Sequence, residues 1–217
     1  TTMTVAVTDQ SGSSPFAGEV YTTTTTNTLS NDAVNWCLGR ATQTTIQSTI
    51  PGGSSQTRTT SAVVDSVNCR NTQEIIEPGS TTLKVTTTLG YDTSGNQNSA
   101  SVVGKNPDGT DMAARLTQWN YGTRRQFPES VTNALGQTGT RTYNYNLGKQ
   151  ASETDPNGIA VSWSYDDFAR KVLETRPDGT YTTWGYYFCD SSNGYCGVAD
   201  LRWYTIRFEY SSIGTLI

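Results

Sequence analysis

The sequence predicts an all-β fold, built from consecutive antiparallel β-hairpins that form a curved, repetitive sheet. Threonine, tyrosine and tryptophan are abundant in the 217 residues, and β-branched or aromatic side chains favour the pleated surface of strands. Apolar and polar residues alternate over short segments, which Gly-containing turns separate at nearly regular intervals. Only 34% of the residues are hydrophobic, too few for the thick core of a sandwich. A sheet with water on both faces, or a wall around a lumen, is therefore favoured.

The overall charge disfavours some partners. The formal net charge of −4 and the pI of about 4.8 argue against nucleic acid, because phosphate binding requires clustered Lys and Arg. Arg124-Arg125 is the one compact basic pair, and we interpret it as a solvated strand end. The apolar runs are too short to span a membrane. No signal peptide is visible, and we expect a processed or trimmed segment. No cofactor is expected, since no phosphate-cradling glycine loop or EF-hand pattern occurs.

The chain contains four cysteines, Cys37, Cys69, Cys189 and Cys196. A Ser-Asn-Gly turn lies between Cys189 and Cys196, so we predict a disulfide across that hairpin, with Cys37 and Cys69 as the remaining pair. Free thiols and a metal site stay as alternatives. The metal site is disfavoured because the chain has no His and no CxxC spacing. Disulfides favour an oxidising compartment.

Residues 1–80 form the first of two predicted regions, a Thr-rich β segment of unknown family. Residues 2–8 and 20–26 have the composition of strands, and Met3, Val5 and Val7 share one face of the first. Breakers at residues 51–55 and 77–80 are typical of turns that connect hairpins.

Residues 81–217 form the second region, which is periodic. Its strand-end tyrosines follow one another at intervals of 30, 24, 20 and 21 residues, and they are Tyr91, Tyr121, Tyr145, Tyr165 and Tyr186. Turns recur with them, at residues 107–110, 133–136, 155–158 and 177–180. Pro presets φ at about −65° and Gly accepts the positive φ of a tight reversal, so these segments favour turns for a physical reason.

Two segments of the second region share a longer pattern. One is Tyr91-Asp92-Thr93-Ser94-Gly95-Asn96, followed by Pro107-Asp108-Gly109. The other is Tyr165-Asp166-Asp167-Phe168-Ala169-Arg170, followed by Pro177-Asp178-Gly179. Both resemble the YD repeat of the bacterial RHS protein family. Residues 143–149, with Tyr145, and residues 155–158, ending in Gly158, are degenerate copies, and Ala169 replaces the usual Gly. The resemblance covers about residues 85–217.

The resemblance implies a fold and a role. Members of this family, which include toxin cocoons and the teneurin shell, wind a spiral of β-hairpins into a hollow shell that often encloses a toxic domain. By resemblance, we expect a non-enzymatic structural scaffold that is secreted or lies at the bacterial cell surface. Its expected partners are further RHS repeats of a longer parent chain, or identical copies joined by edge-strand pairing, and an enclosed toxin domain.

Catalysis is not expected. The chain has no His, so neither a Ser-His-Asp nor a Cys-His system can form within it. Asp166 and Asp167 are adjacent, and adjacent strand residues point to opposite faces. Residues 155–158 resemble the Asp-Pro segment near the self-cleaving region of some RHS proteins, but another repeat follows them. We therefore interpret them as an ordinary turn.

Trp163 and Trp184 support an alternative function, a carbohydrate-binding or adhesin module on the cell surface. Indole rings carry a polar handle and can stack on sugar rings. Cross-strand aromatic pairing, which fixes strand register, is the interpretation that we favour.

Overall fold

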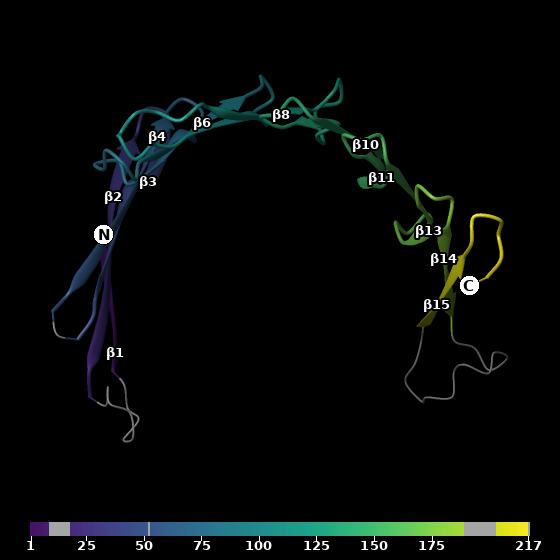
Figure 1. The fold of residues 1–217 in the computed structure, drawn as a ribbon, viewed down its shortest axis with the longest axis horizontal. Coiled ribbons are helices and arrows are strands. Elements are labelled where there is room, and N and C mark those ends of the chain that lie inside the picture. Colours follow the sequence, from purple (N-terminus) through teal and green to yellow (C-terminus); the bar gives the residue numbers. More distant parts are fainter. Residues whose placement is uncertain (9–17, 52, 189–202, 217) are drawn as a thin grey trace. The chain divides into compact units, whose positions relative to one another are not determined.

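The structure is a computed structural model that describes residues 1–8, 18–51, 53–188 and 203–216. Each strand lies beside its neighbours in the sequence, and the strand order of the single sheet runs from β1 to β15 (Figure 1). The predictions of an all-β fold and of consecutive antiparallel hairpins are confirmed. Within the described ranges, no helix is long and apolar enough to cross a membrane.

The chain divides into two compact units, Thr1–Gln118 and Trp119–Ile217. The boundary near residue 80 rests on composition and stays a prediction. The strands are β1 (Thr2–Thr8), β2 (Val20–Asp32), β3 (Cys37–Thr49), β4 (Ser55–Asp65), β5 (Arg70–Ile76), β6 (Val85–Tyr91), β7 (Gln97–Val103), β8 (Arg115–Asn120), β9 (Ser130–Thr132), β10 (Thr138–Asn144), β11 (Lys149–Thr154), β12 (Ala160–Tyr165), β13 (Lys171–Thr175), β14 (Tyr181–Phe188) and β15 (Trp203–Tyr210).

Threonine pairs connect the first strands of the first unit. β2 and β3 have 13 residues each, and many of their threonines stand opposite threonines of a neighbouring strand. Thr4 Oγ1 lies 3.2 Å from Thr24 Oγ1, and Thr45 Oγ1 lies 3.4 Å from Thr59 Oγ1. Cross-strand pairs of this kind contribute about 0.2–1 kcal/mol each. They stabilise strands whose two faces are both accessible to water.

The described residues of neither unit form a thick apolar core. Among the described residues, Cys37 is the one buried hydrophobic residue, at 2% exposure, and Thr182 is the one buried polar residue, at 1%. Most strand residues are half-buried or exposed. The low hydrophobic content therefore corresponds to a thin sheet in each unit, which depends on backbone pairing, cross-strand contacts and turns for its stability.

Candidate functional site

Seven turns in the described residues beyond position 81 share one backbone pattern. The N–H of the first residue donates to the carbonyl of the fifth, and the N–H of the fourth donates to the carbonyl of the first. A type I turn followed by a residue with positive φ is a common hairpin connection of this length. Pro107 and Pro177 take the second position, where a preset φ suits the turn. The turns are residues 92–96, 106–110, 133–137, 155–159, 166–170, 176–180 and 211–215.

The fourth position of all seven turns has positive φ. Ala169 holds one of these positions, at φ 60°. Glycine adopts this region without the Cβ clash that other residues meet. Ala169, the departure from the repeat pattern, therefore keeps the turn geometry and adds backbone strain. The other six positions have φ between 77° and 89° and are Gly95, Gly109, Gly136, Gly158, Gly179 and Gly214.

Carboxylates at the first position close several of these turns. Asp166 Oδ1 accepts the N–H groups of Phe168 and Arg170 at 3.0 and 2.9 Å, and the Arg170 guanidinium donates to Oδ2 at 2.7 Å. Asp92 and Asp155 accept backbone N–H groups in the same way. Desolvation raises the pKa of Asp166, but the hydrogen bonds from Arg170 and from the Phe168 N–H, together with the charge of Arg170, outweigh it and hold the pKa below its ordinary value.

Carboxylates at the third position close the two Pro-Asp-Gly turns. Asp108 Oδ1 accepts the Thr110 hydroxyl at 2.7 Å and the Thr110 N–H at 3.0 Å. Asp178 makes the same two contacts with Thr180, at 2.7 and 2.9 Å. The threonine hydroxyl is the main reason that the pKa of each aspartate lies below its ordinary value. Both turns are therefore stabilised by the ionised carboxylate.

In the part of the chain that the structure describes, four tyrosine hydroxyls donate to backbone carbonyls of the preceding hairpin, at 2.7–2.9 Å. Three of them reach back 15 residues, and Tyr91 reaches back 20. We call this set the tyrosine ladder. The same contact thus joins one hairpin to the next at several places in the chain. The bonds run from Tyr91 to Asn71, from Tyr143 to Pro128, from Tyr165 to Gln150 and from Tyr186 to Lys171.

The tyrosine ladder bridges places where backbone pairing has ended. In the pair β11–β12, Ser152 is the last residue of β11 that pairs with β12. Tyr165 of β12 donates to the carbonyl of Gln150, which lies two positions beyond Ser152. Two neighbouring hairpins separate there, and the phenol spans the gap between them. The pairs β5–β6 and β13–β14 have the same offset, with Asn71 two positions beyond Gln73 and Lys171 two positions beyond Leu173.

Tyr145, which the sequence pattern assigns to the repeat, lies between β10 and β11. Its hydroxyl donates to the Glu129 carboxylate, and the Arg124 guanidinium lies 4.3 Å from its ring centroid. The hydrogen bond to Glu129 raises the pKa of Tyr145. In this hairpin the ladder contact is made by Tyr143, whose ring stacks on Phe127 with centroids 4.7 Å apart. The sequence pattern pointed to Tyr145 as the strand-end tyrosine and did not single out Tyr143.

Two arginines stack on ladder tyrosines. The guanidinium of Arg70 lies 4.3 Å from the ring centroid of Tyr91, and that of Arg170 lies 4.4 Å from the centroid of Tyr186. Each arginine directly precedes the residue whose carbonyl accepts the tyrosine hydroxyl. Such contacts contribute about 0.5–1 kcal/mol at exposed sites. The YD-repeat motif included Arg170, which precedes Tyr186 by 16 residues. Sequence reasoning missed Arg70, because it precedes Tyr91 by 21 residues and so does not match that interval.

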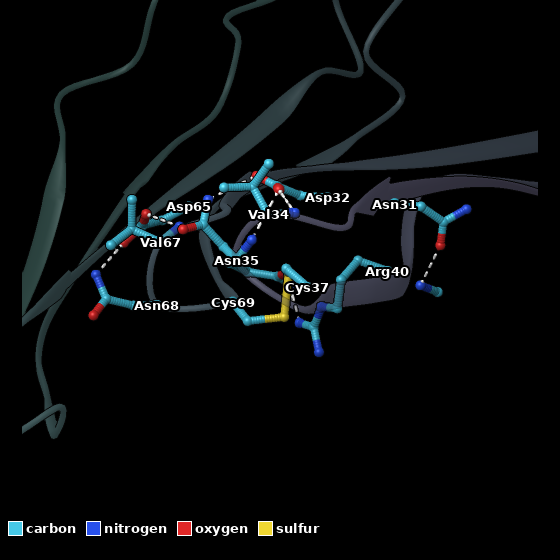
Figure 2. Close-up of a disulfide and its surroundings, with 12 residues drawn as sticks. Asn31, Asp32, Val34, Asn35, Cys37, Arg40, Asp65, Val67, Asn68 and Cys69 are labelled. Carbon is cyan, nitrogen blue, oxygen red and sulfur yellow. Dashed lines mark hydrogen bonds between the residues drawn. A yellow bond between two sulfur atoms is a disulfide. The ribbon is translucent and has the colours of Figure 1, made fainter.

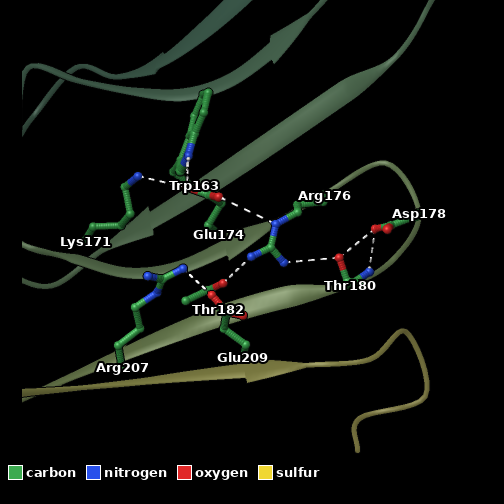
Figure 3. A network of polar contacts seen from close by, with 9 residues as sticks. All are labelled: Trp163, Lys171, Glu174, Arg176, Asp178, Thr180, Thr182, Arg207 and Glu209. Carbon is green, nitrogen blue, oxygen red and sulfur yellow. Dashed lines mark hydrogen bonds and ion pairs between the residues drawn. The ribbon is translucent and has the colours of Figure 1, made fainter. Parts of the chain in front are cut away.

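Trp163 on β12 and Trp184 on β14 are connected through β13. The indole N–H of Trp163 donates to Glu174 Oε2 at 3.0 Å, and Lys171 Nζ donates to the same oxygen at 2.9 Å (Figure 3). Lys171 Nζ also lies 5.6 Å from the Trp163 centroid and 5.3 Å from the Trp184 centroid. The Lys171 hydrogen bond is the main reason that the pKa of Glu174 is lowered. The polar handle of Trp163 is therefore engaged within the sheet.

Arg176 extends this network toward β14. Its guanidinium lies 3.9 Å from Glu174 Oε1 and donates to Thr180 Oγ1 at 3.1 Å (Figure 3). It also donates to the hydroxyl of Thr182, the buried polar residue of the second unit. The desolvated hydroxyl thus has a charged hydrogen-bond partner, as buried polar groups require.

Two loops of the first unit repeat one sequence and one geometry. Residues 32–37 and 65–70 both begin with Asp-x-Val-Asn, 33 positions apart. Asp32 Oδ1 accepts the Val34 N–H at 2.9 Å, and Asp65 Oδ1 accepts the Val67 N–H at 3.0 Å (Figure 2). The fifth residue of each loop has positive φ, 55° and 54°. Sequence reasoning missed this repeat, although the 33-residue spacing was its available signal.

A disulfide joins these two loops. Cys37 and Cys69 are bonded with their Cα atoms 5.2 Å apart, and their sequence separation is 32 (Figure 2). This disulfide is the pairing that the sequence analysis predicted for Cys37 and Cys69. Cys189 and Cys196, for which a local disulfide was predicted, lie outside the described residues. The Cys37–Cys69 bond clamps the hairpin β2–β3 to the hairpin β4–β5.

Comparison with known proteins supports the fold alone. No family model and no curated protein matches the sequence. The crystal structure of TcdB2-TccC3-TEV is similar over 99% of this chain, with a TM-score of 0.55 and 13% sequence identity. The Photorhabdus luminescens Tc holotoxin pore with a mutated TccC3 is similar over 99% of this chain, with a TM-score of 0.54 and 13% identity. The chain spans 11% of the length of each of these proteins. Its consecutive hairpins therefore have counterparts in chains of Tc toxin complexes.

Proposed function

We propose that the chain is a non-enzymatic structural scaffold, a strip of an RHS-type β-shell or of a similar repetitive extracellular assembly. The tyrosine ladder is the observation that carries this proposal. It repeats one contact at four junctions between described hairpins, three of them beyond the last paired residues of the two strands. A strip of any length can be extended by this contact, because each repeat needs only its nearest neighbours.

The charged groups of the second unit support a structural role. Glu174 accepts hydrogen bonds from Trp163 and Lys171, and Asp166 accepts them from Arg170. These side chains bind one another across and within hairpins, and the whole chain lacks His. We therefore propose that they stabilise the sheet and have no catalytic role.

Further RHS repeats of a longer parent chain, or identical copies added at strand edges, would continue the wall. The likeness to Tc toxin structures supports this proposal, since the chain spans only 11% of their length. An enclosed toxin domain is the proposed cargo. A secreted or cell-surface location in a bacterium fits the Cys37–Cys69 disulfide, because disulfides persist in oxidising compartments.

A carbohydrate-binding or adhesin module is the second candidate, and one observation favours it. Trp163 and Trp184 are half-buried, so part of each ring is accessible, and a lysine ammonium lies near both. Aromatic rings beside a hydrogen-bond donor are a common surface for sugar rings.

A glycan array combined with urea unfolding separates the two candidates. For a scaffold, the unchanged protein gives no glycan signal, and Trp163→Ala and Trp184→Ala lower the unfolding midpoint. Trp36→Ala is the matched control, because this indole is 80% exposed and should leave the midpoint unchanged. A different result would favour the binding module over the scaffold: the unchanged protein binds a glycan, and Trp163→Ala and Trp184→Ala each abolish this binding without changing the unfolding midpoint.

A further inference from the structure

We propose that Asn157, in the turn that joins β11 to β12, is a site of spontaneous deamidation, in which its side chain and the backbone nitrogen of Gly158 close a succinimide ring. Water then opens the ring to aspartate or isoaspartate. This inference goes beyond the scaffold function and does not depend on it. Three features of the turn lead to it: the Asn-Gly sequence, the open surroundings of both residues, and the missing anchor of the Asn157 side chain.

The reaction requires only these two residues and water. The Gly158 nitrogen forms a bond to Cγ of Asn157 while the Cγ–Nδ2 bond breaks. Solvent takes the proton of the Gly158 N–H and supplies one to the leaving nitrogen, which departs as ammonia. Water then adds to one of the two ring carbonyls: opening at Cγ gives aspartate, and opening at the backbone carbon gives isoaspartate, whose chain runs through Cγ. Glycine favours the ring closure because it has no Cβ beside the attacking nitrogen.

The turn has open surroundings. Asn157 and Gly158 are both exposed. An added Cβ on Gly158 would have no heavy atom within 4 Å outside its chain neighbours, whereas one on Gly179 of an equivalent turn would meet Ser212 at 3.0 Å. The Gly158 N–H donates to the Asp155 carbonyl at 3.0 Å, so this bond must open before the nitrogen can attack. Exposed turns with few contacts open at a small cost in free energy.

The side chain before glycine is anchored in the Pro-Asp-Gly turns but not in this one. Asp178 Oδ1 accepts the hydroxyl and the N–H of Thr180 at 2.7 and 2.9 Å, and the lowered pKa of Asp178 keeps it an ionised carboxylate, which resists nucleophilic attack. The residue equivalent to Thr180 is Ile159, which has no hydroxyl and donates its N–H to Asp155 Oδ1 at 2.8 Å. Among the described contacts, the side-chain oxygen of Asn157 accepts no hydrogen bond. Its Cγ is therefore a neutral electrophile that no donor holds in place.

Deamidation would weaken the turn. Asn157 Nδ2 donates to Asp155 Oδ2 at 3.2 Å, and the Ile159 N–H is the main reason that the pKa of Asp155 lies below its ordinary value. The reaction replaces the donor with a second carboxylate, so repulsion between like charges replaces the hydrogen bond. The first residue of the two Pro-Asp-Gly turns is Asn106 or Arg176, so neither has a carboxylate there. Isoaspartate also lengthens the backbone of the turn. The hairpin β11–β12 should therefore lose stability with age.

Peptide mapping by mass spectrometry tests the site in the full 217-residue chain, incubated in neutral buffer at physiological temperature. Trypsin releases peptides 150–170 and 126–141, whose single asparagines are Asn157 and Asn133. Asn133 is the internal reference, because its side-chain oxygen accepts two backbone N–H groups at 2.9 and 3.1 Å. Asn157 should convert to aspartate and isoaspartate at least about tenfold faster than Asn133. Conversion of Asn157 no faster than that of Asn133 would overturn the proposal.

Two variants test the structural reason and the consequence. Ile159→Thr supplies the hydroxyl that the equivalent turns have, so it should slow the conversion of Asn157 roughly two- to tenfold, the effect of one hydrogen bond on a rate. Asn157→Gln keeps the amide but must close a larger ring, so its urea midpoint should stay constant during incubation while that of the unchanged protein falls. Equal conversion of Asn157 in Ile159→Thr, or an equal fall of the midpoint in Asn157→Gln, would overturn the proposal. Neither result changes the scaffold proposal.

Discussion

Replacing Ala169 with glycine is expected to stabilise the second unit by about 0.5–1 kcal/mol. Ala169 has φ 60° at the position where the six equivalent turns have glycine. A residue with a Cβ loses roughly 1–2 kcal/mol in this region. The greater freedom of glycine in the unfolded chain offsets about 0.4–1 kcal/mol of the gain. Gly158→Ala is the matched reverse change and should destabilise by a similar amount, because an added Cβ there has no atom within 4 Å.

Urea unfolding followed by tryptophan fluorescence measures both changes. The midpoint should rise for Ala169→Gly and fall for Gly158→Ala, with the same urea dependence as the unchanged protein. The melting temperature should shift in the same directions, by roughly 2–8 °C. If Gly158→Ala is destabilising and Ala169→Gly is neutral or destabilising, positive φ is not the source of strain at Ala169.

Three further changes test other contacts. Removing both Cys37 and Cys69 by substitution with Ala should lower the free energy of unfolding of the first unit by about 3–4 kcal/mol, from the entropy of the loop that the disulfide closes; a reductant should then have no further effect on that unit. Tyr165→Phe should lower the stability of the second unit by about 0.5–1.5 kcal/mol, whereas Tyr21→Phe, an exposed tyrosine of the first unit, should not; equal midpoints for Tyr165→Phe and the unchanged protein would contradict the ladder. The pKa of Asp178 is lowered in the folded state, mainly by the Thr180 hydroxyl, so its contribution should be present above the ordinary aspartate pKa of about 3.9 and be lost as pH falls through the folded value. Unfolding midpoints measured between about pH 6 and 2 should therefore decline less for Asp178→Asn.

The turns were predictable from sequence because their geometry is local. Gly109 and Gly179 follow Pro-Asp, and both have the positive φ that this pattern predicts. The partners of the tyrosines were not predictable, since each hydroxyl bonds a carbonyl in another hairpin. Tyr143 and Tyr145 have nearly equivalent intervals to Tyr165, 22 and 20 residues. Only the position of the preceding hairpin decides which of the two reaches a backbone carbonyl.

The first 80 residues were harder to interpret. Their turns at 32–37 and 65–70 use Asp-x-Val-Asn and not Pro-Asp-Gly, so the compositional signal of the second region is missing. The structure nevertheless continues the same succession of antiparallel hairpins through β1 to β5. Backbone pairing and cross-strand threonines are sufficient to continue the sheet when the turn sequence changes.

Electron microscopy of the protein in its native assembly tests most directly whether the chain is part of a wall. We predict a continuous thin wall of hairpins, with adjacent strands about 4.7–4.9 Å apart, in which this chain is a segment of a shell or filament. Isolated small particles with no continuation at any strand edge would contradict the scaffold.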